Sequence, residues 1–210
     1  MKKIKYKINL VCGCGHTGST IFSRIIGEHS KLYFPNKETN TFLLYNDFKR
    51  ASLISELETH CKINNYEQIL EKTNRHVWHI DYIRNNYDNV KFILITRNAK
   101  DVISSLFKRE IKKTKSNLIK SINRYRDDSL WTLRQKNKSD CITIKYEDFI
   151  KNPKKILTKV YRFMNLKYEK EIMNYDKNII NWNHQSLLRK TNGVGEKNHD
   201  LLRNWQINQK

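Results

Sequence analysis

The feature that most constrains the fold of this chain is a glycine-containing loop between a short apolar segment and an amphipathic helix. Residues 7–12 predict a buried strand and residues 19–28 a helix. The loop between them reads Gly-Cys-Gly-His-Thr-Gly-Ser-Thr over residues 13–20. Glycines let backbone approach an anion, and a helix N-terminus stabilises negative charge. The loop therefore predicts a phosphate or sulfate cradle, the alternative being that its glycines only form a tight turn.

The alternation of strand and helix continues along the chain. Residues 91–96 predict a second strand followed by an amphipathic helix, and residues 141–145 predict a third strand followed by a helix that starts near Pro153. Such alternation favours a three-layer α/β fold, with a mostly parallel central sheet between flanking helices. We expect one domain over residues 1–210, with ligands at the carboxyl ends of the strands. Further helices are predicted at residues 51–61, 66–71, 77–87 and 118–136.

The composition indicates a polyanionic partner but does not identify its chemical class. The chain has 41 Lys and Arg residues against 21 Asp and Glu, a formal net charge of +20. This charge suits nucleic acid, an anionic lipid surface, an acidic glycan or a charged nucleotide, and much of it also suits a solvated surface. The four cysteines form no CxxC pair, so we expect reduced thiols and no metal site. No apolar run reaches membrane length, and we expect a cytoplasmic protein.

The end of the glycine loop argues against a P-loop kinase. A Walker A motif ends in Gly-Lys-Ser or Gly-Lys-Thr, whereas here Ser19 and Thr20 follow Gly18. No carboxylate suited to Mg²⁺ is evident after a strand. A nucleotide or nucleoside kinase nevertheless stays open as an alternative because it shares the architecture. A basic nucleic-acid-binding protein is the other alternative, although no base-stacking motif stands out.

The loop GCGHTGST resembles the 5′-phosphosulfate loop of sulfotransferases, nearer to their bacterial and carbohydrate branch. The resemblance implies a P-loop NTPase-like fold that binds the co-substrate 3′-phosphoadenosine 5′-phosphosulfate (PAPS). His16 stands where many members have Arg or Lys, so its charge depends on pH. The loop residues implied to bind the donor are Gly15, His16, Thr17, Gly18, Ser19 and Thr20.

A second segment is similar to the part of the same family that binds the 3′-phosphate. It reads KFILITRNAKDVISSLFKR over residues 91–109, with Ser105 eight positions after Arg97. An arginine at a strand end can direct two donors at one phosphate, and a hydroxyl on the next helix can join it. The resemblance thus implies Arg97 and Ser105 as 3′-phosphate ligands. Arg189 and Lys190 resemble the basic loop that closes over the nucleotide, and Lys190 is a further candidate.

The candidate catalytic residues also follow from the resemblance. EKTNRH, over residues 71–76, looks like the EKTPxH stretch of the family and implies that Lys72 stabilises charge on the leaving group. Glu38 resembles the glutamate that serves as the base in carbohydrate sulfotransferases. Histidine is the competing chemistry, because His16, His76, His79 and His184 could each act as a base near neutral pH, with His76 ranked next after Glu38. His16 would also stabilise the leaving phosphate together with Lys72.

The sequence therefore predicts a sulfotransferase that moves a sulfuryl group from PAPS to a hydroxyl or amine, a glycan being one candidate acceptor. Transfer would be direct and in line, with no metal and no covalent intermediate. Segments 40–65 and 111–137 are expected to contact the acceptor. The sequence predicts no specific nucleic-acid partner, no transmembrane segment and no particular oligomeric state.

Overall fold

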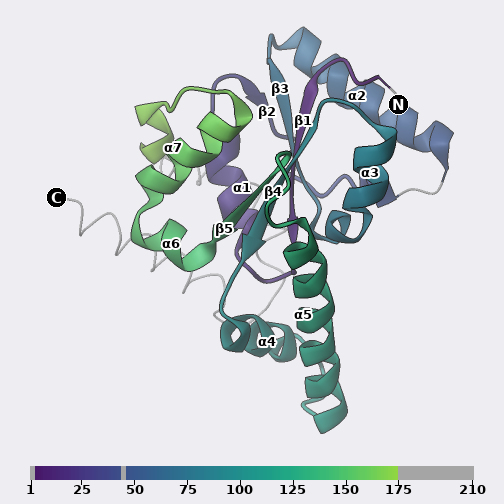
Figure 1. The fold of residues 1–210 in the computed structure, drawn as a ribbon, viewed down its shortest axis with the longest axis vertical. Helices are drawn as coiled ribbons and strands as arrows, with labels where there is room; N and C mark the ends of the chain where they lie inside the picture. Colours follow the sequence, from purple (N-terminus) through teal and green to yellow (C-terminus); the bar gives the residue numbers. More distant parts are fainter. Residues whose placement is uncertain (1–2, 44–45, 175–210) are drawn as a thin grey trace.

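A five-stranded parallel sheet forms the centre of the molecule (Figure 1). The computed structural model describes residues 3–43 and 46–174. Every neighbouring pair of strands is parallel, and their order across the sheet is β2-β3-β1-β4-β5. The α/β fold with a parallel central sheet is thus confirmed. The strands are β1 (Lys7–Gly13), β2 (Leu32–Tyr33), β3 (Gln68–Lys72), β4 (Val90–Thr96) and β5 (Cys141–Lys145).

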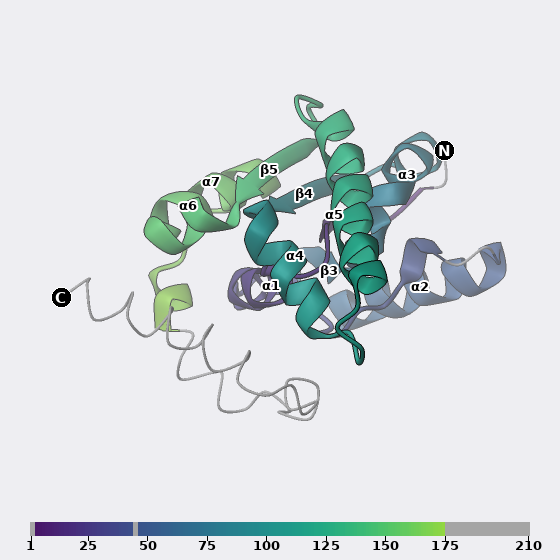
Figure 2. The ribbon, with the colours of Figure 1, turned by 90° about the horizontal axis from the view of Figure 1, so that it is seen from below.

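Helices cover both faces of this sheet. In Figure 2, α1, α6 and α7 lie to one side of the strands, and α2 and α3 lie to the other. The helices are α1 (Ser19–Gly27), α2 (Asp47–Ile63), α3 (Ile80–Asn86), α4 (Ala99–Lys108), α5 (Lys115–Gln135), α6 (Tyr146–Lys151) and α7 (Pro153–Met164), with short 3-10 turns η1 (Thr41–Leu43), η2 (Asn74–His79) and η3 (Lys170–Asn174).

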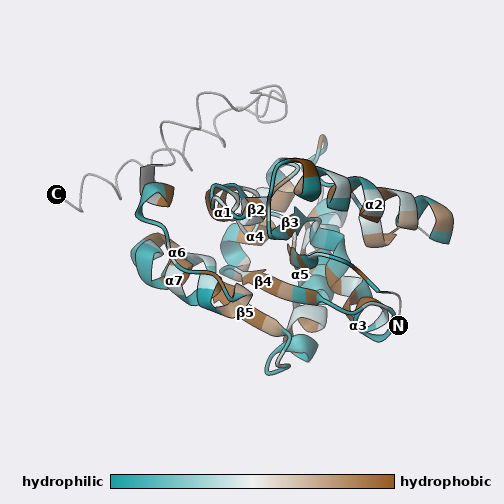
Figure 3. Cartoon of the chain, turned by 90° about the horizontal axis from the view of Figure 1, so that it is seen from above, coloured by the Kyte–Doolittle hydropathy of each residue, from teal (hydrophilic) through white to brown (hydrophobic). Residues whose placement is uncertain are grey.

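Alternating strand residues supply two separate hydrophobic cores. On β4, Ile93 and Ile95 join the core beneath α1 and α7, while Phe92 and Leu94 join the core beneath α2 and α3. All four side chains are at most 1% exposed. Figure 3 shows apolar residues concentrated on β4 and β5. Continuous apolar runs are typical of parallel strands that are covered on both faces.

The helix predicted at residues 66–71 is wrong, because the structure has strand β3 there. All five residues of β3 are buried, including polar ones that favoured a surface helix in the sequence. Gln68 is satisfied by an amide donor from Asn9 at 2.9 Å and by donating to the Met164 carbonyl at 3.0 Å. These partners lie 59 and 96 residues away, so no local pattern could reveal them. The two-residue strand β2 was also not predicted.

The strand order places a topological switch point at the carboxyl edge of the sheet. β1 lies between β3 and β4, so the loop after β1 leads to the β2 and β3 side and the loop after β4 leads toward β5. Where neighbouring parallel strands send their loops in opposite directions, a ligand site opens between them. The glycine loop and the segment that starts at Arg97 both lie at this edge.

Candidate functional site

The glycine loop is held tightly against its neighbours at both ends. Gly13 has φ +136°, and a Cβ there would lie 2.7 Å from the Ile95 carbonyl oxygen of β4. Gly18 has φ +88°, and a Cβ there would lie 2.2 Å from the ring of Tyr146. Residues with side chains rarely adopt such φ values. Glycine is therefore required at both ends for the loop to turn from β1 into α1.

The middle of the loop lies beneath two polar side chains from other elements. A Cβ on Gly15 would be 2.9 Å from the Arg124 guanidinium and 4.0 Å from the Asn74 amide nitrogen. Asn74 also accepts a hydrogen bond from the Ser19 hydroxyl at 2.8 Å. Nitrogen donors of Arg124 and Asn74 thus lie against the loop at Gly15, an arrangement that suits an anion.

His16 joins the two segments that the sequence assigned to the two ends of the donor. Its Nδ1 lies 2.8 Å from the Ser105 hydroxyl oxygen on α4, although the residues are 89 positions apart. His16 has φ +69°, a left-handed conformation that is uncommon outside glycine and asparagine. The structure therefore brings His16 and Ser105 together, with the loop and the following helix in direct contact.

Four cationic side chains gather around His16. Burial lowers the pKa of His16, and the cations Arg109, Arg124, Lys72 and Arg97, in that order, lower it further, to about 4. His16 is consequently neutral near pH 7 and would act as a hydrogen-bonding group rather than a cation. The four cations come from the end of α4, from α5, from β3 and from the end of β4. A bound polyanion would relieve their mutual repulsion, so this is the strongest candidate anion site in the part of the chain that the structure describes.

Replacing His16 by Asn should reduce the acid sensitivity of the fold. Between about pH 6.5 and 4 the unfolded histidine binds a proton and the folded one does not, so wild-type stability falls as pH falls through this window. Asn cannot titrate, and it tolerates left-handed φ. Thermal unfolding at pH 7 and pH 5 should show a smaller loss for His16→Asn than for wild type, whereas equal losses would contradict a depressed His16 pKa.

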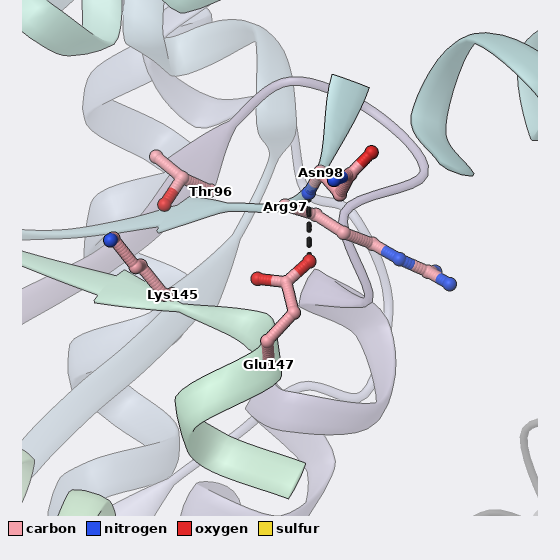
Figure 4. Close-up of a pocket in the computed structure, with 5 residues that line it drawn as sticks. All are labelled: Thr96, Arg97, Asn98, Lys145 and Glu147. Carbon is pink, nitrogen blue, oxygen red and sulfur yellow. Dashed lines mark hydrogen bonds between the residues drawn. The ribbon is translucent and has the colours of Figure 1, made fainter. Parts of the chain in front are cut away.

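Arg97 lies at the end of β4 beside a shallow pocket (Figure 4). The Glu147 carboxylate accepts a hydrogen bond from the Asn98 backbone N–H at 2.7 Å, which joins the segment after β4 to the start of α6. The Arg97 side chain extends away from Lys145 and Glu147 in Figure 4. The pocket is lined by Thr96, Arg97, Asn98, Lys145 and Glu147.

The Arg97 guanidinium is oriented by an aromatic ring. Its central carbon lies 4.7 Å from the ring centroid of Tyr146, the residue that also packs against Gly18. Its Nε lies 3.6 Å from an Asp101 carboxylate oxygen and makes no hydrogen bond. The Arg97 side chain is 18% exposed. A partly buried guanidinium with unused donor capacity fits a phosphate ligand.

The structure pairs the two residues expected to act in catalysis. The Lys72 ammonium donates to a Glu38 carboxylate oxygen. The Lys72 side chain is 9% exposed, while that of Glu38 is 46% exposed. Lys72 therefore faces the interior of the site, next to the loop, and Glu38 lies at its open side.

His76, the other candidate base, is fully buried, whereas the Glu38 side chain is 46% exposed. Its Nδ1 lies 3.1 Å from a Glu71 carboxylate oxygen, and its Nε2 accepts from the Phe42 backbone N–H at 3.3 Å. Burial raises the pKa of Glu71, but His76 and hydrogen bonds from Thr73 and Thr39 lower it more. With 0% exposure, the His76 side chain is not accessible to an acceptor. It instead fixes the segment that follows Glu38.

Helix α5 contributes site residues that sequence reasoning missed. Asp128 is 5% exposed and accepts a hydrogen bond from the Trp78 indole at 2.7 Å. Burial raises the pKa of Asp128, although contacts with Cys14, Trp78, Arg124 and the Gly15 backbone oppose the shift. Asp128 thus contacts the loop at Cys14 and Gly15. Arg109 and Asn74 were not predicted either. For α5, the sequence signal that could have been used is the spacing of four between Arg124 and Asp128, which places both side chains on one face of a helix.

Four further expectations concern Thr17, Lys190, a metal site and a membrane span. Thr17 bonds within the loop, its hydroxyl donating to the Cys14 carbonyl at 2.8 Å. Lys190 lies outside the described residues. Within residues 3–43 and 46–174, no group of three or more His, Cys, Asp and Glu side chains is arranged to hold a metal ion. No helix in those ranges is long and apolar enough to cross a membrane.

A glycine loop among cations at the carboxyl edge of a parallel sheet defines an α/β protein with a candidate site for an anionic ligand such as a nucleotide. Comparison with family models makes this specific, because residues 35–170 match the sulfotransferase family. The chain belongs to the sulfotransferase family. The sequence-based expectation of a sulfuryl-transferring enzyme is confirmed at this level.

Solved structures of sulfotransferases share the fold at low sequence identity. A search of curated proteins finds no match. The sulfotransferase domain of the Synechococcus PCC 7002 olefin synthase aligns with TM-score 0.63 and 14% identity, over 83% of this chain and 78% of that one. The domain from the curacin biosynthetic pathway gives 0.61 and 16%, over 82% and 78%. Mouse sulfotransferase SULT7A1 complexed with PAP gives 0.59 and 19%, over 80% and 62%.

Proposed function

We propose that the chain transfers a sulfuryl group from PAPS directly to a hydroxyl or amine of an acceptor. The observation that carries the proposal is the convergence of Arg109, Arg124, Lys72 and Arg97 on the His16 loop. PAPS is an anion at both ends, with a 5′-phosphosulfate and a 3′-phosphate. The loop residues 15–20 would hold the phosphosulfate, and Arg97 with Ser105 would hold the 3′-phosphate.

The contact between His16 and Ser105 supports this arrangement. At 2.8 Å it joins the phosphosulfate loop to the helix proposed to bind the 3′-phosphate. A single nucleotide would therefore be held at both ends, across the carboxyl ends of β1 and β4. Fixing a donor at two points orients its sulfur for in-line attack and lowers the entropic part of the barrier.

Glu38 is the proposed base and Lys72 the proposed cation at the leaving group. In the transfer, the acceptor oxygen or nitrogen bonds to sulfur, its proton passes to the Glu38 carboxylate, and the bond from sulfur to the bridging phosphate oxygen breaks. Lys72 would stabilise the charge that then develops on that oxygen. The exposure of Glu38 on the open side supports its access to an acceptor. A carbohydrate hydroxyl is one acceptor class that fits the basic surface.

Replacement of Glu38 by Gln tests this assignment. Loss of a general base should lower the turnover of PAPS with a competent acceptor by about 10²- to 10⁴-fold. Binding of 3′-phosphoadenosine 5′-phosphate should change little, because Glu38 would contact the acceptor and not the nucleotide. Release of the bisphosphate from PAPS is measured across a panel of hydroxyl and amine acceptors.

Glu67→Gln is the matched control, since Glu67 forms an exposed ion pair with Lys31 away from the loop. It should retain wild-type turnover. Equal turnover by Glu38→Gln and Glu67→Gln would remove Glu38 from the mechanism. Consumption of ATP with Mg²⁺ but not of PAPS would overturn the proposed function itself.

A further inference from the structure

The segment from the end of α4 through the first half of α5 is strongly basic. We call residues 108–126 the α4–α5 tip. The tip contains one acidic residue, Glu110. Figure 1 shows α5 with α4 beside it extending well beyond the carboxyl edge of the sheet. Its basic residues are Lys108, Arg109, Lys112, Lys113, Lys115, Lys120, Arg124 and Arg126.

Aliphatic side chains are exposed among these cations. Ile111 is 98% exposed, and Leu118, Ile119 and Ile122 on α5 are 37%, 46% and 42% exposed. Scattered apolar residues on a surface are ordinary, but four aliphatic residues within twelve positions of one basic segment form a cluster. The tip therefore presents apolar and cationic groups together.

Hydrogen bonds hold the turn that displays Ile111. The Lys113 ammonium donates to the carbonyls of Phe107, Lys108 and Glu110 at 2.7, 2.7 and 2.6 Å, which closes the end of α4. The Asn117 amide donates to the Lys112 carbonyl at 2.9 Å. Thr114 caps α5 by accepting from the Asn117 backbone N–H at 3.2 Å. The exposure of Ile111 is thus a consequence of an ordered turn.

We propose that the α4–α5 tip binds the surface of a lipid bilayer that contains anionic lipids. Lysines near such a surface are attracted by its negative potential, while aliphatic side chains enter the boundary between headgroups and acyl chains. The charge of the tip complements such a surface and opposes self-association of two tips. The proposal concerns a surface outside the proposed catalytic residues and goes beyond the proposed function.

The chemistry of the tip fits a bilayer better than another macromolecule. Protein interfaces are enriched in aromatic residues and depleted of lysine, whereas the exposed apolar residues here are aliphatic and lysines surround them. Single-stranded nucleic acids are bound through exposed aromatic rings, and Tyr125, the one aromatic residue of the tip, packs against the core formed by Cys14, Val102 and Leu106.

The tip is also continuous with the candidate anion site. Arg109 and Arg124 belong to it and are close enough to His16 to lower its pKa. Vesicle experiments are therefore done with and without saturating 3′-phosphoadenosine 5′-phosphate, so that binding through the nucleotide site is separated from binding through the outer surface.

Co-sedimentation with vesicles tests the proposal. The chain should bind vesicles made of equal parts phosphatidylcholine and phosphatidylserine, and bind phosphatidylcholine alone at least about tenfold more weakly. About 0.5 M salt should weaken the binding to the mixed vesicles. Lys112→Glu with Lys120→Glu should lower the affinity at least about tenfold, and Ile111→Ser with Ile119→Ser should lower it several-fold.

Matched variants on α2 show whether a loss of vesicle affinity comes from the tip itself or from the change in net charge and surface hydrophobicity. Lys49→Glu with Lys62→Glu makes the same charge change elsewhere, and Phe48→Ser with Ile63→Ser removes side chains that are 82% and 71% exposed. Both pairs should bind vesicles within about twofold of wild type.

The proposal would be overturned if the α2 variants lost as much vesicle affinity as the tip variants, or if the chain bound neutral and anionic vesicles equally well. It would also be overturned if the chain bound RNA or an acidic protein but no vesicles. Failure of the proposed function would appear separately, as absent binding of the bisphosphate in solution.

Discussion

Gly13→Ala is expected to destabilise the fold by about 3 kcal/mol or more. The new methyl group would lie 2.7 Å from the Ile95 carbonyl oxygen, a backbone atom of the neighbouring strand that cannot move without breaking sheet pairing. Alanine at φ +136° adds strain of its own. Urea unfolding should show this loss, and reduced nucleotide binding should accompany it because the loop begins at this residue.

Gly15→Ala is the matched control for stability, in the middle of the same loop. Its Cβ would approach the Arg124 guanidinium at 2.9 Å, the far end of a flexible side chain that is 47% exposed and can shift where backbone cannot. The φ of Gly15 lies outside the left-handed region, so alanine adds no backbone strain there. We expect the stability of Gly15→Ala to stay within about 1 kcal/mol of wild type. A Gly13→Ala variant as stable as this control would contradict the close packing of the loop against β4.

Arg97→Ala is expected to weaken binding of 3′-phosphoadenosine 5′-phosphate by about 10- to 100-fold. A charge-assisted hydrogen bond contributes about 1.5–3 kcal/mol, and an arginine can make two to one phosphate. Tyr146 already orients the guanidinium, whose carbon lies 4.7 Å from the ring centroid, so little further ordering is needed on binding. Calorimetry with the bisphosphate measures the effect.

Titration with adenosine 5′-phosphate distinguishes the loss of a contact with the 3′-phosphate from a general loss of positive charge at the site. It lacks the 3′-phosphate, so Arg97→Ala should affect its binding far less than that of the bisphosphate. Arg97→Lys keeps the charge but loses the paired donors, and an intermediate affinity is expected. If Arg97→Ala lowered the affinity for both nucleotides equally, Arg97 would contribute only to the general positive charge of the site and would not contact the 3′-phosphate.

The parallel sheet and the site's position could be predicted because they follow from local patterns. Each strand at residues 7–12, 91–96 and 141–145 is a short apolar run with a helix after it, and parallel strands bring the following loops to one edge. The strand β3 could not be predicted in this way. Its buried Gln68 and Glu71 are stabilised by partners from β1, α7 and residue 39, which only the folded chain brings together.

The candidate site was predictable only where a motif was continuous in sequence. The loop, Lys72 and Arg97 follow from such motifs. Arg109, Arg124 and Asp128 come from α4 and α5, where nothing distinguishes them from the many other charged residues of a basic chain. His76 shows the opposite problem, because its residue type suggested a base while its burial beside Glu71 gives it a positioning role.

Calorimetric titration of the wild-type chain with 3′-phosphoadenosine 5′-phosphate, with ATP and Mg²⁺ as the comparison ligand, tests whether the glycine loop and Arg97 form a binding site for the sulfuryl donor. Four cations around a neutral His16 predict tight binding of the bisphosphate that weakens with salt, and much weaker binding of ATP with Mg²⁺. Preferential binding of ATP with Mg²⁺, or no binding of either ligand, would contradict the account.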